Sequence, residues 1–172
     1  MKFKYQLLIL ILCYCGCVFA QHSEYEVKAA LIEKFSRFVE WQIEKDTQQS
    51  FKIGVLGKDN YGDVIENLYS NWKIKGRKVE ITYPVTDEEI VSCDIIFISS
   101  TYAHNIKFLL QLIATEPILT ISDRENDVQN GIMINMYLNR NKVIYDINLT
   151  SFQKSGLKVS SLLLDAAKTV NN

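Results

Sequence analysis

Two short apolar runs constrain the fold of this chain more than any other feature. The stretches DIIFIS (94–99) and PILTIS (117–122) are almost continuously apolar and rich in isoleucine. A strand that is covered on both faces has this composition, and such strands belong mostly to parallel sheets with helices on either side. The two runs therefore predict central strands of a sheet that is buried on both faces.

The rest of the chain alternates between strand-like and helix-like patterns. Further strands are expected at 51–57 and 78–84, and helices at about 24–41, 61–71, 87–92 and 103–114. This alternation predicts an α/β fold with parallel crossovers. The expected fold class is α/β, with a mostly parallel sheet and flanking helices in three layers.

The C-terminal third adds an antiparallel hairpin to this expectation. Residues 131–149 have alternating apolar and polar side chains, interrupted at 139–141 by residues that tolerate a left-handed backbone. A helical turn near 150–155 should end at Gly156, and a last helix is expected at about 158–170.

The first 20 residues have the pattern of an export signal. Two lysines precede an apolar run, and small side chains at positions 18 and 20 place the expected cleavage before Gln21. The run is too short for a comfortable membrane span. A lipoprotein signal with Cys17 as the acylated residue is the alternative, and the residues around Cys17 fit it poorly. We expect a signal peptide over 1–20 and a single exported domain over 21–172.

Charge and cysteine content argue against nucleic-acid and membrane partners and against an internal disulfide. The chain has 19 lysines and arginines against 20 aspartates and glutamates, and two of the lysines belong to the export signal. The remaining domain is weakly acidic and has no basic run, so neither nucleic acid nor a membrane surface is an expected partner. Of four cysteines only Cys93 lies outside the signal, so no disulfide is expected within the mature chain. Cys93 is expected to be buried, with intermolecular pairing as the alternative.

The expected first helix carries a wide apolar arc. At 100° per residue, its apolar side chains from Val27 to Trp41 spread over about 200° of the helix surface. A single packing surface would leave part of that arc in water, so a second neighbour or a second subunit is expected to cover the rest. Lys34 lies within the arc, and we expect its long side chain to reach solvent, with a buried ion pair as the alternative. The residues expected in the core are Val27, Leu31, Phe35 and Phe38, and the candidate interface residues are Arg37, Glu40 and Trp41.

No catalytic group can be assembled from the sequence. The only histidines, His22 and His104, are not spaced with Cys93 as metal ligands. Neither enzymatic activity nor a cofactor or metal is therefore expected. A polar set does follow the expected strands, at the edge where open parallel sheets bind small ligands. These candidate ligand-binding residues are Lys58, Ser99, Ser100, Ser122 and Asp123, and helix capping is their alternative role.

The order of these segments resembles the YfiR family of small exported bacterial proteins. The likeness rests on residues 25–41, 51–63, 93–100, 118–123 and 131–167, which together cover most of the expected mature chain. It implies an α/β fold, a periplasmic location and a regulatory role without enzymatic activity. It also implies a partner, the periplasmic portion of an inner-membrane signalling protein such as a diguanylate cyclase or a sensor kinase. Some members of the family are homodimers, so a homodimer is a second expectation.

Two hypotheses remain open at this point. The first is a periplasmic regulator that binds and restrains a membrane signalling protein. The second is a periplasmic small-molecule-binding protein that uses the polar set at the ends of the strands. On the resemblance, Cys93 matches a family cysteine, but the cysteines that pair with it in some relatives are missing here. Redox sensing through an internal disulfide is therefore not expected.

Overall fold

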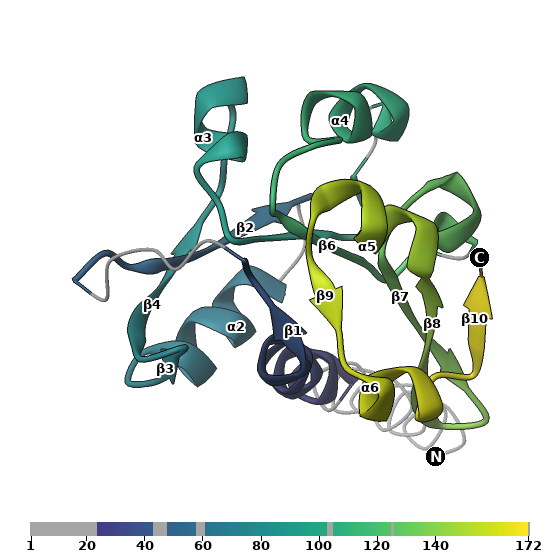
Figure 1. The fold of residues 1–172 in the computed structure, drawn as a ribbon. Helices are drawn as coiled ribbons and strands as arrows, with labels where there is room; N and C mark the ends of the chain where they lie inside the picture. Colours follow the sequence, from purple (N-terminus) through teal and green to yellow (C-terminus); the bar gives the residue numbers. More distant parts are fainter. Residues whose placement is uncertain (1–23, 43–47, 58–60, 103–104, 125, 172) are drawn as a thin grey trace, which may run out of the picture.

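The computed structural model of the chain describes residues 24–42, 48–57, 61–102, 105–124 and 126–171 (Figure 1). The expected export signal, Lys58 and both histidines lie outside the described residues.

A helix over residues 24–38 comes first, and strands and helices then alternate along most of the chain. In chain order the following elements are β1 (Val39–Glu40), β2 (Phe51–Leu56), α2 (Tyr61–Tyr69), β3 (Lys73–Ile74), β4 (Arg77–Thr82), α3 (Asp87–Val91), β5 (Ile95–Ile98), α4 (Ile106–Leu112), β6 (Leu119–Ser122), the 3-10 helix η1 (Asp127–Asn130), β7 (Ile134–Asn139), β8 (Lys142–Asn148), α5 (Leu149–Ser155), β9 (Lys158–Val159), α6 (Ser161–Asp165) and β10 (Thr169–Asn171).

Most of the strands belong to one mixed sheet, in the order β10-β8-β7-β6-β5-β2-β4-β3. At its centre β4, β2, β5, β6 and β7 run parallel to one another. Towards the edges, β3 is antiparallel to β4 and β8 is antiparallel to β7, whereas β10 runs parallel to β8. The chain passes from β2 outward to β4 and then back to β5, so the direction of winding changes between β2 and β5, as in doubly wound sheets. The expected α/β class is confirmed, and the sheet is mixed.

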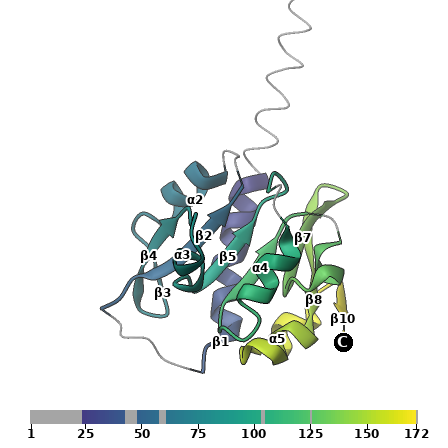
Figure 2. The same ribbon diagram turned by 90° about the horizontal axis from the view of Figure 1, so that it is seen from above.

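Helices cover both faces of the central strands (Figure 1, Figure 2). In β5, Ile95 and Phe97 belong to the same core cluster as the N-terminal helix and α2. Their neighbours Ile96 and Ile98 belong to a second cluster with residues of α3 and α4. All four side chains are fully buried. This two-sided burial explains why the run in the sequence lacks polar alternation.

The N-terminal helix packs on the sheet with one margin of the expected apolar arc, so Phe35 is buried as expected. Its buried residues are Lys28, Ala29, Ile32, Phe35 and Ser36, whereas Val27 is 45% exposed. The buried stripe has the spacing of a helix that packs on a single surface. The placement of Val27 in the core was therefore wrong.

The remainder of the wide arc forms a surface that we call the apolar shoulder. It consists of Val27 and Ala30, which are exposed, and Leu31 and Phe38, which are half-buried. The last two pack against the rim of the core. The arc expected from the sequence thus divides into a core side and a surface side.

The C-terminal third follows the expectation up to Gly156 and departs from it afterwards. Arg140 and Asn141 turn the β7–β8 hairpin with φ angles of 47° and 62°. Gly156 ends α5 with φ of 74°. The last helix expected at 158–170 was wrong, because this stretch forms β9, α6 and β10. β9 pairs with β1 at the end of the N-terminal helix, and β10 pairs with β8 at the edge of the sheet.

Phe35 is the residue of the N-terminal helix whose truncation we expect to destabilise the protein most. Its ring is fully buried and meets Tyr145 edge-on, with 4.9 Å between the ring centroids. Phe35→Ala should lower the free energy of unfolding by about 3–5 kcal/mol, because it leaves a cavity in the core. Phe38→Ala should cost less, because Phe38 is half-buried. Urea unfolding followed by circular dichroism measures both losses, and equal losses would contradict this placement of the helix.

Candidate functional site

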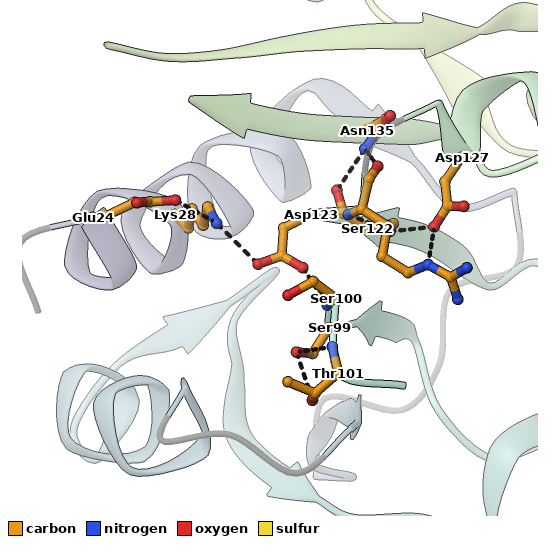
Figure 3. A network of polar contacts seen from close by, with 10 residues as sticks. Glu24, Lys28, Ser99, Ser100, Thr101, Ser122, Asp123, Asp127 and Asn135 are labelled. Carbon is orange, nitrogen blue, oxygen red and sulfur yellow. Dashed lines mark hydrogen bonds and ion pairs between the residues drawn. The ribbon is translucent and has the colours of Figure 1, made fainter. Parts of the chain in front are cut away.

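Polar side chains gather where β5 and β6 end, next to the N-terminal helix (Figure 3). Four of the five candidate ligand-binding residues are described, and all four lie here: Ser99, Ser100, Ser122 and Asp123. The fifth, Lys58, lies outside the described residues. We call these four residues, together with Lys28 and its second partner Glu24, the sheet-edge cluster.

A buried ion pair between Lys28 and Asp123 forms the centre of the sheet-edge cluster. Lys28 Nζ lies 2.9 Å from Asp123 Oδ2, and the two side chains are 6% and 3% exposed. Glu24, one helical turn earlier, lies 2.7 Å from the same nitrogen. Burial alone would lower the pKa of Lys28, but the two carboxylates outweigh it and raise this pKa above the ordinary value for lysine. Lys28 is therefore charged at neutral pH.

Asp123 also binds the end of the neighbouring strand. Its Oδ1 accepts a hydrogen bond from the backbone N–H of Ser100, with a donor–acceptor distance of 2.6 Å. One carboxylate thus joins the N-terminal helix, the end of β6 and the turn that follows β5. A buried carboxylate needs such partners, because its removal from water costs several kcal/mol.

Ser99 and Gly57 bring the ends of β5 and β2 into close contact. Ser99 is fully buried, and its Oγ lies 3.1 Å from Oγ1 of Thr101. Gly57 has a φ of 125°, and a Cβ at this position would stand 2.7 Å from Cβ of Ser99. This is the point at which the winding of the sheet changes direction. A residue larger than glycine does not fit between these two strand ends.

Ser122 belongs to the other half of the cluster, towards β7. Its Oγ donates a hydrogen bond of 2.6 Å to Asp127 Oδ2, and both residues are buried. Arg124 Nε lies 3.5 Å from the same carboxylate oxygen. The amide of Asn135 donates to the carbonyl oxygens of Ser122 and Arg124, at 3.2 and 2.6 Å. These bonds hold the segment between β6 and η1 against the sheet.

The sheet-edge cluster fastens the N-terminal helix to the sheet. Ser99 and Ser122 are buried, and Asp123 is half-buried with its side chain only 3% exposed. All three bond within the protein, whereas Ser100 is exposed. Asp127 and Asn135, which the sequence reasoning did not select, complete the network. The hydroxyl, amide and carboxylate groups here can bind polar ligands, but most of them already have partners in the protein.

Lys28 is the most important residue that the sequence reasoning missed. Lys34, the lysine that it did single out, is exposed, in agreement with the expectation. The signal for Lys28 was present in its spacing, four residues before Ile32 and seven before Phe35 on the buried stripe. A lysine on such a stripe requires a buried acidic partner.

The candidate interface residues lie together at the end of the N-terminal helix. Arg37 and Glu40 are exposed, and Arg37 pairs with Glu33 one turn earlier on the helix. Trp41 is half-buried, and its ring meets Phe51 edge-on with 5.6 Å between the centroids. Arg37 and Glu40 are therefore accessible to a partner, whereas Trp41 packs largely against the rim of the core.

Within the part of the chain that the structure describes, no group of three His, Cys, Asp or Glu side chains is placed to hold a metal ion. None of the helices in the same ranges combines the length and the hydropathy needed to cross a bilayer.

Cys93 is 1% exposed, which confirms the expected burial, and its Sγ lies 3.4 Å from the carbonyl oxygen of Glu89.

Comparison with known proteins connects this chain to a family and to solved folds. A family model described as YfiR/HmsC-like matches residues 25–168. No curated protein matches the sequence significantly.

Two solved structures are similar in fold. One is a conserved domain protein from Vibrio cholerae O1 biovar El Tor, with a TM-score of 0.58 and 14% identity over 86% of this chain. The other is an ABC domain in complex with L-Trp from Streptococcus pneumoniae, with a TM-score of 0.56 and 15% identity over 85% of this chain. The chain spans 60% of the length of each of them. At these identities the likeness shows the fold alone.

Removal of one partner of the buried ion pair should destabilise the protein strongly. Asp123→Asn leaves the buried Lys28 ammonium without its enclosed carboxylate partner, so the free energy of unfolding should fall by about 3 kcal/mol. Glu24→Gln is the matched control, because Glu24 binds the same ammonium from a position that is 26% exposed. This variant should cost less than about 1 kcal/mol. Urea unfolding compares the two, and a loss at Asp123 no larger than at Glu24 would contradict the role of the pair.

The same ion pair should make stability depend on alkaline pH. The pKa of Lys28 is raised in the folded protein, so its stabilising contribution is complete below the unfolded pKa of about 10.4 and is lost as pH rises through the folded pKa. Lys28→Met should therefore be less stable than the wild type at pH 7, and this difference should shrink above pH 10.4. Ionisation of tyrosines affects both proteins and cancels in the difference. A difference that stays constant up to pH 12, measured by urea unfolding at each pH, would contradict this assignment.

Proposed function

The chain belongs to the YfiR/HmsC-like family, and on this basis we propose that it is an exported, non-enzymatic regulator. In this proposal it binds the periplasmic portion of an inner-membrane signalling protein and holds that protein inactive. The family relationship favours a diguanylate cyclase or a sensor kinase as this partner.

The apolar shoulder of the N-terminal helix is the observation that supports a binding role best. It places the exposed Val27 and Ala30 beside the half-buried Leu31 and Phe38. The exposed cation of Lys34 lies within this surface, one helical turn from Ala30 and from Phe38, and the exposed Arg37 lies beside it. Protein–protein interfaces commonly combine apolar side chains with charged groups that remain close to solvent.

The shoulder is also held in a fixed orientation. The Lys28–Asp123 ion pair anchors the helix to the sheet, and the β1–β9 pairing anchors its end to the C-terminal segment. A regulator can only shift its partner by binding one of its states better than the other. A rigid surface serves this purpose, because a difference of about 1–3 kcal/mol in binding free energy between the two states is enough for a useful switch.

The second hypothesis, a small-molecule-binding protein, rests on the convergence of its candidate residues at the sheet edge. Ser100 is exposed there, and its backbone N–H binds the enclosed carboxylate of Asp123. A thermal shift screen with amino acids, vitamins and nucleotides tests this alternative, since a ligand that binds the folded state raises its melting temperature. The absence of any stabilising compound would count strongly against it.

Genetic complementation tests the proposed regulatory role. In the bacterium that encodes this protein, deletion of its gene should raise the level of cyclic-di-GMP or the output of a membrane kinase. Reintroduction of the wild-type gene should restore repression. Ala30→Glu places a negative charge on the apolar shoulder and should fail to restore repression, while the protein stays folded. Val85→Glu is the control, because Val85 is 87% exposed and lies outside the shoulder.

Two results would contradict the proposal. One is that Ala30→Glu restores repression as well as Val85→Glu does. The other is that the deletion changes neither cyclic-di-GMP nor kinase output, and that crosslinking recovers no membrane partner.

A further inference from the structure

A pocket of about 380 Å³ lies between α4 and α5. Its floor includes Thr120 of β6 and Met133, which precedes β7. Ligand sites in proteins have volumes of about 300–1,000 Å³, so this pocket suits a small molecule. It shares no residue with the sheet-edge cluster or with the apolar shoulder, and no expectation from the sequence pointed to it.

The pocket opens on the face of the sheet that carries α4. Leu119 and Ile121 point into the core cluster of the N-terminal helix, so Thr120 between them points to the opposite face. Helix α4 packs Ile106 and Leu109 into the second core cluster. Next to Ile106 and Leu109 lies a second row of side chains, and this row lines the pocket. It consists of Lys107, Leu110, Gln111 and Ala114.

The charges of the lining residues are of one sign. Lys107 comes from α4 and Lys154 from α5, and both are exposed. Among the described residues that line the pocket, none is acidic. A cleft bordered by cations alone attracts anions, because the low-dielectric walls concentrate its field.

The interior of the pocket combines an apolar wall with polar groups at its floor and rim. Leu110, Ile113 and Met133 supply the apolar surface. Thr120 Oγ1 accepts a hydrogen bond of 3.0 Å from the N–H of Met133, so the hydroxyl proton can be donated to another acceptor. Ser151 Oγ donates a bond of 2.8 Å to the carbonyl oxygen of Gly131 and can itself accept one.

We propose that this pocket binds a small organic carboxylate with a short apolar chain. The carboxylate would bind between the ammonium groups of Lys107 and Lys154, and the chain would pack on Leu110 and Met133. This site goes beyond the proposed regulatory function, because the binding needs no partner protein. It would also give the domain a means of responding to an organic acid in its surroundings.

Three probes of equal length and different charge test the proposal: hexanoate, hexanamide and hexylammonium. In a titration of the ¹⁵N-labelled mature protein followed by NMR, hexanoate should shift the amide signals of α4, α5 and residues 130–133. Hexanamide should bind several-fold more weakly, and hexylammonium should leave these signals unchanged. The proposal is overturned if hexanoate and hexanamide bind equally well, or if hexanoate shifts no signal of the pocket.

Variants of the lining residues provide an independent check. Lys107→Gln and Lys154→Gln should each weaken hexanoate binding about two- to fivefold, the effect of one partly solvated charge. Lys142→Gln, an exposed lysine of β8 outside the pocket, is the matched control and should leave the affinity unchanged. Ala114→Trp should abolish binding by filling the pocket, and circular dichroism verifies that each variant is folded. An equal loss in Lys142→Gln, or full binding by Ala114→Trp, would overturn the proposal.

Discussion

The carboxylate of Asp123 holds together parts of the chain that no local pattern would bring together. One oxygen binds the Lys28 ammonium of the N-terminal helix, and the other binds the backbone after β5. Because both charges are buried, they are stable only as a pair, and the helix has to present Lys28 to the sheet. This requirement places Ala29, Ile32 and Phe35 in the core and leaves the apolar shoulder outside. The surface proposed to meet a partner is therefore determined by a contact inside the protein.

A second buried ion pair acts in the same way at the opposite ends of the parallel strands. Arg77, at the start of β4, donates hydrogen bonds to both oxygens of Asp94, at 3.0 and 2.8 Å, just before β5 begins. It also donates to the carbonyl oxygen of Gln49 ahead of β2, and Asp94 accepts from the N–H of Lys52 in β2. The parallel strands thus have an enclosed ion pair where they begin and another where they end. Apolar packing alone leaves the relative alignment of neighbouring strands less well defined than these directional contacts do.

Much of this fold was predictable from the sequence, and the part that was not has a common physical cause. The central strands, most of the helices and the β7–β8 hairpin follow from local patterns of apolar residues and from turn residues such as Asn141 and Gly156. The segment at 158–170 has a helical pattern, yet two short strands form within it because β1 and β8 offer them hydrogen-bonding partners. In the candidate site, the polar residues that follow the strands were predictable from parallel topology. The ion pair that connects them to Lys28 was not predictable. It depends on which part of the wide apolar arc of the N-terminal helix meets the sheet.

The pairing of β1 with β9 has a consequence for how the chain reaches its native state. Val39 pairs with Val159, so the end of the first helix is completed by a segment near the other end of the sequence. Contacts between such distant residues form late, because the chain between them must first lose much of its freedom. The first helix cannot complete this contact until the segment around Val159 is available to pair with it. The N-terminal helix therefore stays without this contact for longer than a helix in a domain built from local contacts would.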